Sequence, residues 1–310
     1  MKWLRGRSSG VGLDLGSESI KVVQLKRAGG RCVIEAWGRG PVPPGTVDRG
    51  LIRDKGAIAA AIRRLLEEKG IRSRRVVTAV PASFCYIKCL VLPSLGIREL
   101  KQAANLQIKN SLPWPREDAV VDVAVYGRSP DGRETEVLAV GVKKSIVLDL
   151  NQTLQEAGLT PVVVEIQPLS AYRLLHSQCD SGGTLLVDLG ASGVQFAYFA
   201  YGRLQLVRSL ALGYVEYQRQ PVVEDVAREI HRTLEYAQVQ KVMVEPTRVV
   251  ITGGGAEREG MGEKLQSLLP YWQISDALSL TGFPAISDSV ALPGPSYLPA
   301  LGMAWREAMV

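Results

Sequence analysis

Two short acidic turns are the residues of this chain best suited to chemistry. Residues 11–25 read VGLDLGSESIKVVQL, and residues 185–199 read LLVDLGASGVQFAYF. In each copy an Asp-Leu-Gly turn joins two apolar segments that have the alternation of β-strands. Glycine lets the backbone come close to an anion, the amides after it can point at phosphate oxygens, and a carboxylate suits hydrated Mg²⁺. The repeated pattern predicts a phosphate and magnesium site formed from both copies.

A glycine-rich turn adds a third element to this predicted site. The segment Ile251-Thr252-Gly253-Gly254-Gly255-Ala256 follows a predicted strand and leads into helical Met261–Leu269, an arrangement suited to close approach by a nucleotide. A single turn of either kind is commonly a plain turn or loop, so the prediction depends on the three occurring together. The candidate nucleotide-binding residues are Asp14, Gly16, Ser17, Ser19, Lys21, Asp188, Gly190, Ala191, Ser192, Gly213, Gly253, Gly254 and Gly255. Asp14 and Asp188 are the candidate Mg²⁺ ligands, acting through water; Lys21 is open to a second interpretation, as part of a solvated strand face.

The elements that must position these turns are themselves duplicated. Each copy continues through a Gly-Arg turn into a third strand, and an amphipathic helix and a further strand follow. In the first copy Asp54 caps a helix that ends at Gly70, before a strand at 75–80; in the second, the helix begins near Val223 and the strand spans 248–252. We therefore predict an α/β protein with a first lobe over residues 1–182 and a second over 183–310.

An insertion of about sixty residues, at about 81–144, interrupts the first lobe. It contains a predicted helix from Ile97 to Ser111 and strand-like segments at 119–126 and 135–142. The Leu112-Pro113-Trp114-Pro115 stretch ends that helix and leaves a large aromatic side chain beside a rigid turn. Trp114 is the candidate partner-binding residue, because tryptophan is favoured at binding hot spots. The alternative is that Trp114 fills the core of the small subdomain.

Composition excludes several other classes of protein. Apolar residues make up 46% of the 310 residues and charged residues 22%, as in folded globular proteins. The apolar runs are far too short to span a bilayer, and no apolar stretch follows the basic start, so we expect a cytoplasmic location. Four cysteines and two histidines have no zinc-site spacing, which favours reduced core thiols. The net charge of +6 is scattered without interleaved aromatic residues, so we expect no nucleic-acid binding.

The ordered set of motifs resembles the actin, hexokinase and heat-shock chaperone ATPase superfamily. It comprises the two Asp-Leu-Gly turns, a connecting helix at Gln167-Pro168, the Gly-Gly-Gly turn and a final helix with Pro299-Ala300-Leu301-Gly302-Met303-Ala304. Within that superfamily the opening VGLDLGSESIKVVQLKR, the insertion segment LPSLGIRELKQAANLQIKNSLPWPREDAVVDVAVYG and the ending ALGMAWRE resemble the PilM family of type IV pilus assembly proteins over nearly the whole chain. The resemblance implies the duplicated ribonuclease-H-like fold of actin-like ATPases, with an inserted subdomain in lobe one.

The resemblance also implies a function and partners. A PilM-like protein is a scaffold that binds the cytoplasmic tail of a PilN-like bitopic membrane protein. It lies at the inner face of the cell membrane through its partners, in a type IV pilus or a related type II secretion system. Other inner-membrane platform components and further copies of the chain are additional implied partners. ATP with Mg²⁺ is the implied cofactor, and Gln167 is the candidate to orient a water at the γ-phosphate.

One departure from the family pattern leaves the nucleotide site open to two interpretations. The family's Gly-Gly-Asn-x-x-Thr segment is reduced here to residues 212–221, so most of the second-lobe helical subdomain is expected to be missing, and Gly193 replaces a hydroxyl residue. The site is then either a weak ATP site or a degenerate one. The alternative functions are an active ATPase or small-molecule kinase of the same superfamily, and an FtsA-like filament protein. A kinase needs a carboxylate base that faces its substrate, and we cannot identify one in the sequence. An FtsA-like protein needs a C-terminal amphipathic helix, which we do not expect in this chain.

Overall fold

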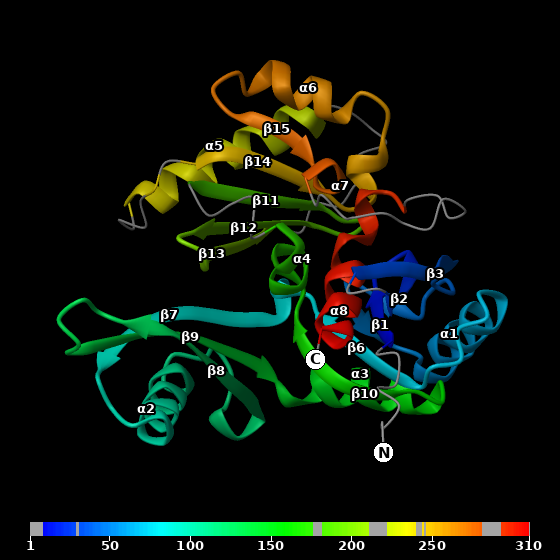
Figure 1. Cartoon of the computed structure of the whole chain (residues 1–310), viewed down its shortest axis with the longest axis horizontal. Helices are drawn as coiled ribbons and strands as arrows, with labels where there is room; N and C mark the ends of the chain where they lie inside the picture. The colour runs from blue at the N-terminus through cyan, green and yellow to red at the C-terminus, as the bar shows by residue number, and fades with distance from the viewer. Residues whose placement is uncertain are drawn as a thin grey trace.

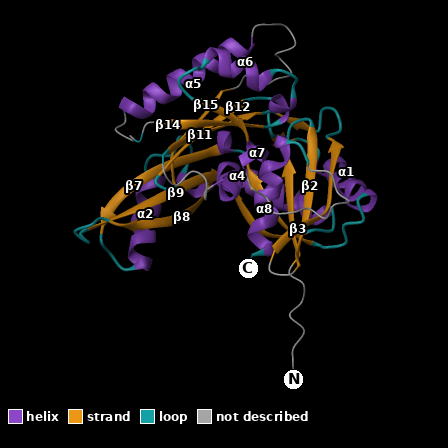
Figure 2. Ribbon diagram, turned by 45° about the horizontal axis from the view of Figure 1, so that its top comes forward, coloured by secondary structure: helices purple, strands orange, loops and turns teal. Residues whose placement is uncertain are grey.

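Three β-sheets and the helices that cover them make up the architecture. The computed structural model describes residues 9–28, 31–175, 182–210, 222–239, 244, 246–280 and 293–309. Figure 1 shows a second five-stranded sheet above the first, with a three-stranded sheet projecting beside them, and Figure 2 shows the same three layers from a turned view. No helix in the described ranges is long and apolar enough to span a bilayer.

The first sheet has the strand order β10-β6-β1-β2-β3. Its strands are β1 (Ser9–Leu15), β2 (Ser19–Ala28), β3 (Arg31–Pro41), β6 (Arg75–Val80) and β10 (Thr160–Ile166). β1, β2 and β3 form an antiparallel meander, whereas β6 and β10 run parallel to β1. A small hairpin of β4 (Val47–Asp48) and β5 (Leu51–Ile52) follows β3.

The second sheet repeats this topology, with the order β13-β12-β11-β14-β15. Its strands are β11 (Gly183–Leu189), β12 (Val194–Ala200), β13 (Arg203–Leu210), β14 (Pro246–Thr252) and β15 (Gln273–Asp276). Again the first three strands are antiparallel, and the last two run parallel to the first. The duplication predicted from sequence is confirmed for the four strands predicted in each copy, and β10 and β15 complete the two sheets.

The covering helices follow the same repeat. α1 (Lys55–Glu68) and α5 (Val222–Val239) occupy equivalent places in the chain, as do α3 (Lys144–Glu156) and α6 (Met261–Leu268). α4 (Gln167–Leu175) follows β10, and α7 (Ala277–Leu280) follows β15. The predicted cap of α1 is confirmed, because the Asp54 carboxylate accepts a hydrogen bond from the Ala57 amide at 2.9 Å.

The insertion is a separate three-stranded sheet with one covering helix. Its elements are β7 (Cys85–Pro93), α2 (Ile97–Lys109), β8 (Ala119–Arg128) and β9 (Glu134–Lys143), and the strand order is β7-β9-β8. α2 buries Leu100, Ala104 and Ile108 against Leu90, Val123 and Val137 of the sheet. The predicted helix and strands of the insertion are confirmed, and the subdomain has a small core of its own.

The C-terminal helix α8 (Leu298–Ala308) lies directly on the first sheet. Its backbone comes so close to β1 that a Cβ added at Gly12 would lie 2.0 Å from the Ala300 carbonyl oxygen. A Cβ at Gly302 would lie 1.8 Å from the Ser170 carbonyl oxygen of α4. Since α8 follows the second sheet in sequence but packs on the first, the division of the chain at residues 182 and 183 stays a proposal.

We predict that Gly302→Ala destabilises the fold because the new methyl group forces α8 away from α4. Overpacking of this kind costs about 3 kcal/mol in the free energy of unfolding. Gly56→Ala is the matched control, since Gly56 is exposed in the first turn of α1 and has no close neighbour outside its own turn. We expect it to stabilise the protein by about 0.5 kcal/mol. Urea denaturation of both variants measures the two changes; equal effects would contradict the close contact of α8 with α4.

Candidate functional site

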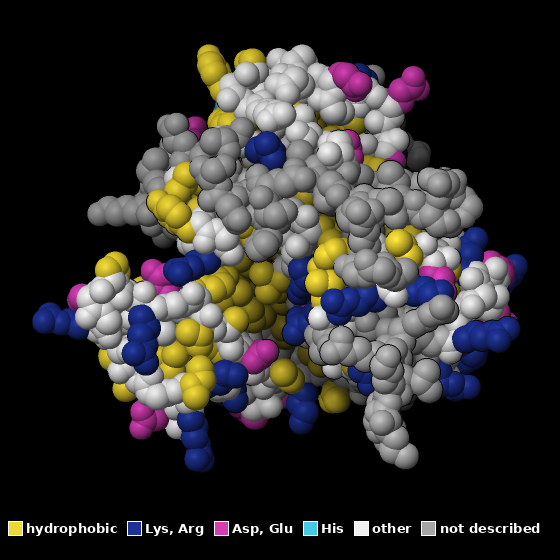
Figure 3. Space-filling model, in the orientation of Figure 1, with side chains coloured by type: hydrophobic (Ala, Val, Ile, Leu, Met, Phe, Trp, Pro, Cys, Tyr) yellow, Lys and Arg dark blue, Asp and Glu magenta, His cyan; other side chains and the backbone are white. Residues whose placement is uncertain are grey.

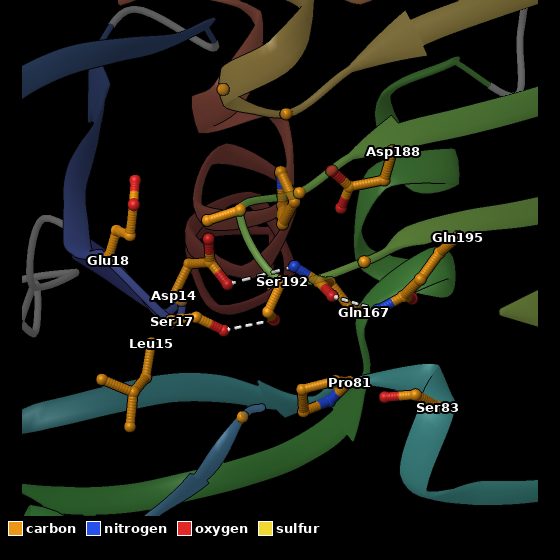
Figure 4. Close-up of a pocket in the computed structure, with 18 of the residues that line it drawn as sticks. Asp14, Leu15, Ser17, Glu18, Pro81, Ser83, Gln167, Asp188, Ser192 and Gln195 are labelled. Carbon is orange, nitrogen blue, oxygen red and sulfur yellow. Dashed lines mark hydrogen bonds between the residues drawn. The ribbon is translucent and has the colours of Figure 1, made fainter. Parts of the chain in front are cut away.

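A cavity of about 360 Å³ lies where the two sheets face one another, and both Asp-Leu-Gly turns line it (Figure 4). The predicted residues that line it are Asp14, Gly16, Ser17, Ser19, Lys21, Gln167, Asp188, Gly190, Ala191, Ser192, Gly253 and Gly254. Gly255 lies just behind this lining, with its Cα next to Leu189. Gly213 and the shortened segment at 212–221 lie outside the described residues. The structure therefore brings three turns, distant in sequence, to one cleft.

The two Asp-Leu-Gly turns share one backbone geometry. Asp14 pairs with Lys21 across β1 and β2, and Asp188 pairs with Gln195 across β11 and β12 at the same register. The Gly16 amide donates to the Ser19 carbonyl at 3.0 Å, and the Gly190 amide donates to the Gly193 carbonyl at the same distance. Each turn therefore places its aspartate at the end of the first strand, facing the cleft.

The side chains opposite the two aspartates break this symmetry. Lys21 Nζ lies 3.6 Å from Asp14 Oδ2 in a buried ion pair, whereas the equivalent position in the second copy is the neutral Gln195. Burial raises the pKa of Asp188 to about 6, and the Asp14 charge adds to the increase while Lys21 opposes it. Burial also raises the pKa of Asp14, against the effect of Lys21. Asp188 is thus the carboxylate that gains most from a divalent cation in the cleft.

Gln167, the candidate water-orienting residue, begins α4 and makes contacts at both ends of its side-chain amide. Its Nε2 donates to Asp14 Oδ1 at 3.3 Å, and its Oε1 accepts from Gln195 Nε2 at 3.4 Å (Figure 4). Both distances are at the long end for hydrogen bonds, so these contacts are weak. Gln195 Oε1 in turn accepts from the Ala82 amide at 3.4 Å. Gln167 therefore helps to hold Asp14, and it is a neutral group that cannot take a proton from water.

Further contacts cross the cleft between the lobes. The hydroxyls of Ser17 and Ser192, one from each turn, lie 2.6 Å apart. At the other side of the cleft Arg39 of β3 forms an ion pair with Glu257, whose Oε2 is 2.9 Å from the guanidinium, and Ser296 donates to Glu257 Oε1 at 2.5 Å. The Arg39 guanidinium also stacks 5.4 Å from the centre of the Tyr297 ring. These contacts hold the two turns against each other.

The glycine-rich turn approaches the second aspartate closely. Gly253 has a φ of 85°, and a Cβ there would lie 2.3 Å from Asp188 Oδ1. A Cβ at Gly255 would lie 2.7 Å from the Leu189 Cβ. Only glycine suits both positions, and the backbone of this turn forms one wall of the cavity. The two carboxylates, the turn amides and this open wall suit a hydrated Mg²⁺ with phosphate groups.

Sequence reasoning missed Gln195, Arg39 and Glu257. Gln195 could have been found from the repeat, because it stands seven residues after Asp188 as Lys21 stands seven after Asp14. Arg39 and Glu257 come from different lobes and have no shared motif, so only the fold brings them together. Trp114 lies apart from the cavity lining, half-buried beside Lys143. Among the described residues, no three His, Cys, Asp or Glu side chains are grouped as a metal site.

We predict that the stability of the protein depends on pH through Asp188, because no described cation is paired with this buried carboxylate. Its pKa is about 6 in the folded protein against 3.8 in the unfolded chain, so the folded state holds more protons between these values. Wild-type stability therefore falls as pH rises from 4 to 6, and Asp188→Asn removes this loss. The variant gains on the order of 2 kcal/mol over wild type between pH 4 and pH 7, by urea unfolding.

Asp131→Asn provides the control for this pH profile. Hydrogen bonds from Ser129 and from the Arg133 amide lower the pKa of Asp131, which is an exposed carboxylate at the β8–β9 turn. A lowered pKa stabilises the folded state above the unfolded value, so this variant loses stability relative to wild type as pH rises. Parallel profiles for the two variants would contradict the assigned environment of Asp188.

Comparison with known proteins agrees with this geometry. Residues 12–217 match the family described as "Type IV pilus assembly protein PilM". A solved structure of the PilM-PilN type IV pilus biogenesis complex aligns with a TM-score of 0.84 at 22% identity, over 96% of this chain and 98% of that one.

Two other solved structures share the fold at greater distance. The cytoplasmic domain of EpsL, an inner-membrane component of the Vibrio cholerae type II secretion system, aligns with a TM-score of 0.51 at 13% identity, over 97% of this chain and 95% of that one. The ethanolamine utilization protein EutJ from Carboxydothermus hydrogenoformans aligns with a TM-score of 0.50 at 17% identity, over 96% and 89%. The predicted fold class, an actin-like ATPase fold, is confirmed. The family match spans about two thirds of the chain, so the chain belongs to the PilM family of type IV pilus assembly proteins.

Proposed function

We propose that this chain is a scaffold of type IV pilus assembly, which binds the cytoplasmic tail of a PilN-like membrane protein at the inner face of the cell membrane. The observation that carries the proposal is membership of the PilM family, together with the fold shared over nearly the whole chain with the PilM of a PilM-PilN complex. Asp14 is paired with Lys21 and Gln167 is neutral, so neither of these two cleft residues is a free carboxylate base for a kinase.

The docking place that we propose for the tail is the hollow beside the insertion. Figure 3 shows apolar side chains lining a hollow between the insertion and the two lobes. The half-buried apolar residues Ile87 and Val140 belong to the insertion sheet, and Val164 and Leu169 belong to β10 and α4. All four pack against the same core cluster, and we assign them to the walls of this hollow. Such a surface suits the apolar side chains of an extended peptide.

The backbone at this place also suits an extended peptide. β10 is the outermost strand of the first sheet, with β6 on one side and no strand along its other edge among the described residues. An edge strand has unpaired amide and carbonyl groups that can accept a further strand. The tail would then be held by backbone hydrogen bonds to β10 and by apolar contacts with Ile87 and Leu169.

Trp114 is a second proposed contact for the partner. Its side chain is half-buried, Lys143 Nζ lies 5.9 Å from the ring centre, and the indole Nε1 is buried without a hydrogen-bond partner in the described chain. An indole N–H normally has a partner when it is buried, so a carbonyl oxygen from a bound chain would satisfy it. Lys143 ends β9 and leads into α3, at the junction of the insertion and the first lobe.

We further propose that the cleft binds Mg²⁺ and ATP weakly and does not turn ATP over at an enzyme's rate. The turn backbones and the two aspartates suit phosphate and metal, and Lys21 supplies a positive charge. The Ser17–Ser192 contact has to open for phosphates to enter between the turns, which weakens binding. Gln167 is the only candidate we identify for orienting water, and it already contacts Asp14 and Gln195.

We predict micromolar binding of a peptide that copies the cytoplasmic tail of the bitopic membrane protein encoded beside this chain. Ile87→Ala and Leu169→Ala should each raise Kd about tenfold, because each removes an apolar anchor of the peptide. Trp114→Ala tests the second contact in the same titration. Fluorescence anisotropy with the full-length chain is the measurement, and ATP should leave the affinity unchanged.

Val91→Ala is the control for the peptide titration. Val91 lies on the same strand β7, four residues beyond Ile87 and beyond the contact of Cys89 with Leu204, and it is 57% exposed. It should bind the peptide like wild type. Equal affinity in the Ile87, Leu169 and Trp114 variants, with all of them folded, would show that the tail binds elsewhere.

We predict that Mg-ATP at 1 mM stabilises the protein by about 1.4 kcal/mol, as a Kd on the order of 100 μM requires. Asp188→Asn should abolish most of this increase in thermal midpoint, because Asp188 loses its attraction for Mg²⁺. Asp131→Asn should retain it. Turnover should stay below about 1 s⁻¹; a faster rate that Gln167→Ala abolished would refute the scaffold assignment.

A further inference from the structure

The outer face of α2 is a row of positive charges without partners. Arg98, Lys101 and Lys109 belong to α2, and Arg116 belongs to the short 3₁₀ turn Arg116–Asp118 that follows. These four side chains and Gln102, Asn105 and Leu106 line an open groove of about 570 Å³. None of the four cations forms an ion pair or hydrogen bond within the described residues, whereas Arg133 at the β8–β9 turn pairs with Asp131.

The spacing shows why these charges act together. Arg98, Lys101, Asn105 and Lys109 recur at intervals of three and four residues, which places them along one face of a helix. The opposite face buries Leu100, Ala104 and Ile108 in the insertion core. The nearest acidic residue on α2, Glu99, accepts a hydrogen bond from the Gly96 amide at 3.3 Å and lies outside the groove lining.

Helix stability explains Lys109, which lies in the last turn of α2 where the dipole favours a cation, but not the other members of the row. Arg98 lies in the first turn of α2, where the positive end of the helix dipole disfavours a cation. Four like charges around one groove also repel one another. Both costs disappear when an anionic partner occupies the groove, so the charges are placed for binding.

The remaining groove residues indicate the chemistry of the partner. Leu106 is 60% exposed in the middle of the row, and Ile97 is 60% exposed at its beginning. No aromatic side chain lines the groove to stack with a nucleic-acid base. Carboxylates with an apolar residue between them match the cations, the two amides and Leu106.

We propose that this groove, which we call the α2 groove (Arg98, Lys101, Gln102, Asn105, Leu106, Lys109 and Arg116), binds an acidic peptide segment of a second protein. The segment is a different ligand from the membrane-protein tail, because α2 covers one face of the insertion sheet, whereas Ile87 and Val140 lie toward the main core on the other. Figure 3 shows dark-blue side chains projecting from this subdomain at the lower left. The insertion thereby offers two binding faces.

The test uses the full-length chain and a short synthetic helical peptide rich in Glu with one central Leu, labelled for fluorescence anisotropy. Wild type should bind it, and binding should weaken about tenfold from low salt to high salt. The same peptide with Gln for every Glu should not bind. The double variant Arg98→Glu/Lys101→Glu should lose at least about tenfold in affinity. The fold should tolerate both changes, since Arg98→Glu in the first turn of α2 suits the helix dipole and Lys101 is exposed.

Arg72→Glu/Arg74→Glu is the matched control, with the same change in net charge at two exposed residues between α1 and β6, away from the insertion (Figure 1). The control variant should bind the acidic peptide like wild type. A peptide with Lys in place of every Glu should bind the Arg98→Glu/Lys101→Glu variant better than it binds wild type. If both double variants lost the same affinity for the acidic peptide, binding would depend on net charge alone, and the proposal would be overturned. Failure of the acidic peptide, with binding of wild type to phosphatidylglycerol vesicles, would overturn it in favour of a membrane surface.

The tail-peptide titration with Ile87→Ala is independent of this result. If the tail peptide binds as predicted and the acidic peptide does not bind, only the α2 groove proposal is contradicted. If the acidic peptide binds as predicted and Ile87→Ala leaves the tail affinity unchanged, only the proposed tail site is contradicted.

Discussion

Two aspartates held in one buried cleft with a single lysine are the constraint on which this structure depends. The strand meander repeats in both lobes, so each places its Asp-Leu-Gly turn at the same cleft. Burying two carboxylates together costs free energy, and only Asp14 has a cation, Lys21, beside it. Asp188 has Gln195 instead, so its ionisation opposes folding until a cation enters. The cleft therefore has a built-in preference for positive charge.

Sequence reasoning was accurate where the signal was local and periodic. The repeated strand-turn-strand pattern predicted both meanders, and the Asp54 cap and apolar spacing predicted α1. The insertion helix ends at Lys109, two residues before the predicted Ser111, because the chain there turns toward the Leu112-Pro113 stretch. The Asp188 turn and the glycine-rich turn meet because β11 and β14 run parallel in one sheet, so their carboxyl ends lie together. The turn after β1 belongs to the other sheet and meets them because the two sheets face one cavity, a contact that strand periodicity does not contain.

Contacts between distant polar side chains could not be predicted in the same way. Arg39 and Glu257 are separated by more than two hundred residues, and each sits in a segment with no motif. The role of Gln167 was predicted from its place at the start of α4, but its contacts with Asp14 and Gln195 depend on rotamers that the sequence does not encode. The partners of Trp114 are a similar case, because half-burial beside Lys143 follows from how β8 and β9 meet.

The polar chain in the cleft also reaches the insertion. Asp14 contacts Gln167, Gln167 contacts Gln195, and Gln195 accepts from the amide of Ala82, which begins the 3₁₀ turn leading into β7. Each link is long and weak, so a cation that draws Asp14 or Asp188 toward it can break the chain at little cost. The first residues of the insertion are then released from the second lobe, while β13 still contacts β7 through Cys89 and Leu204. A series of weak contacts thus joins the cleft to the first residues of the insertion, whereas the contact of Cys89 with Leu204 holds β7 against β13 independently of the cleft.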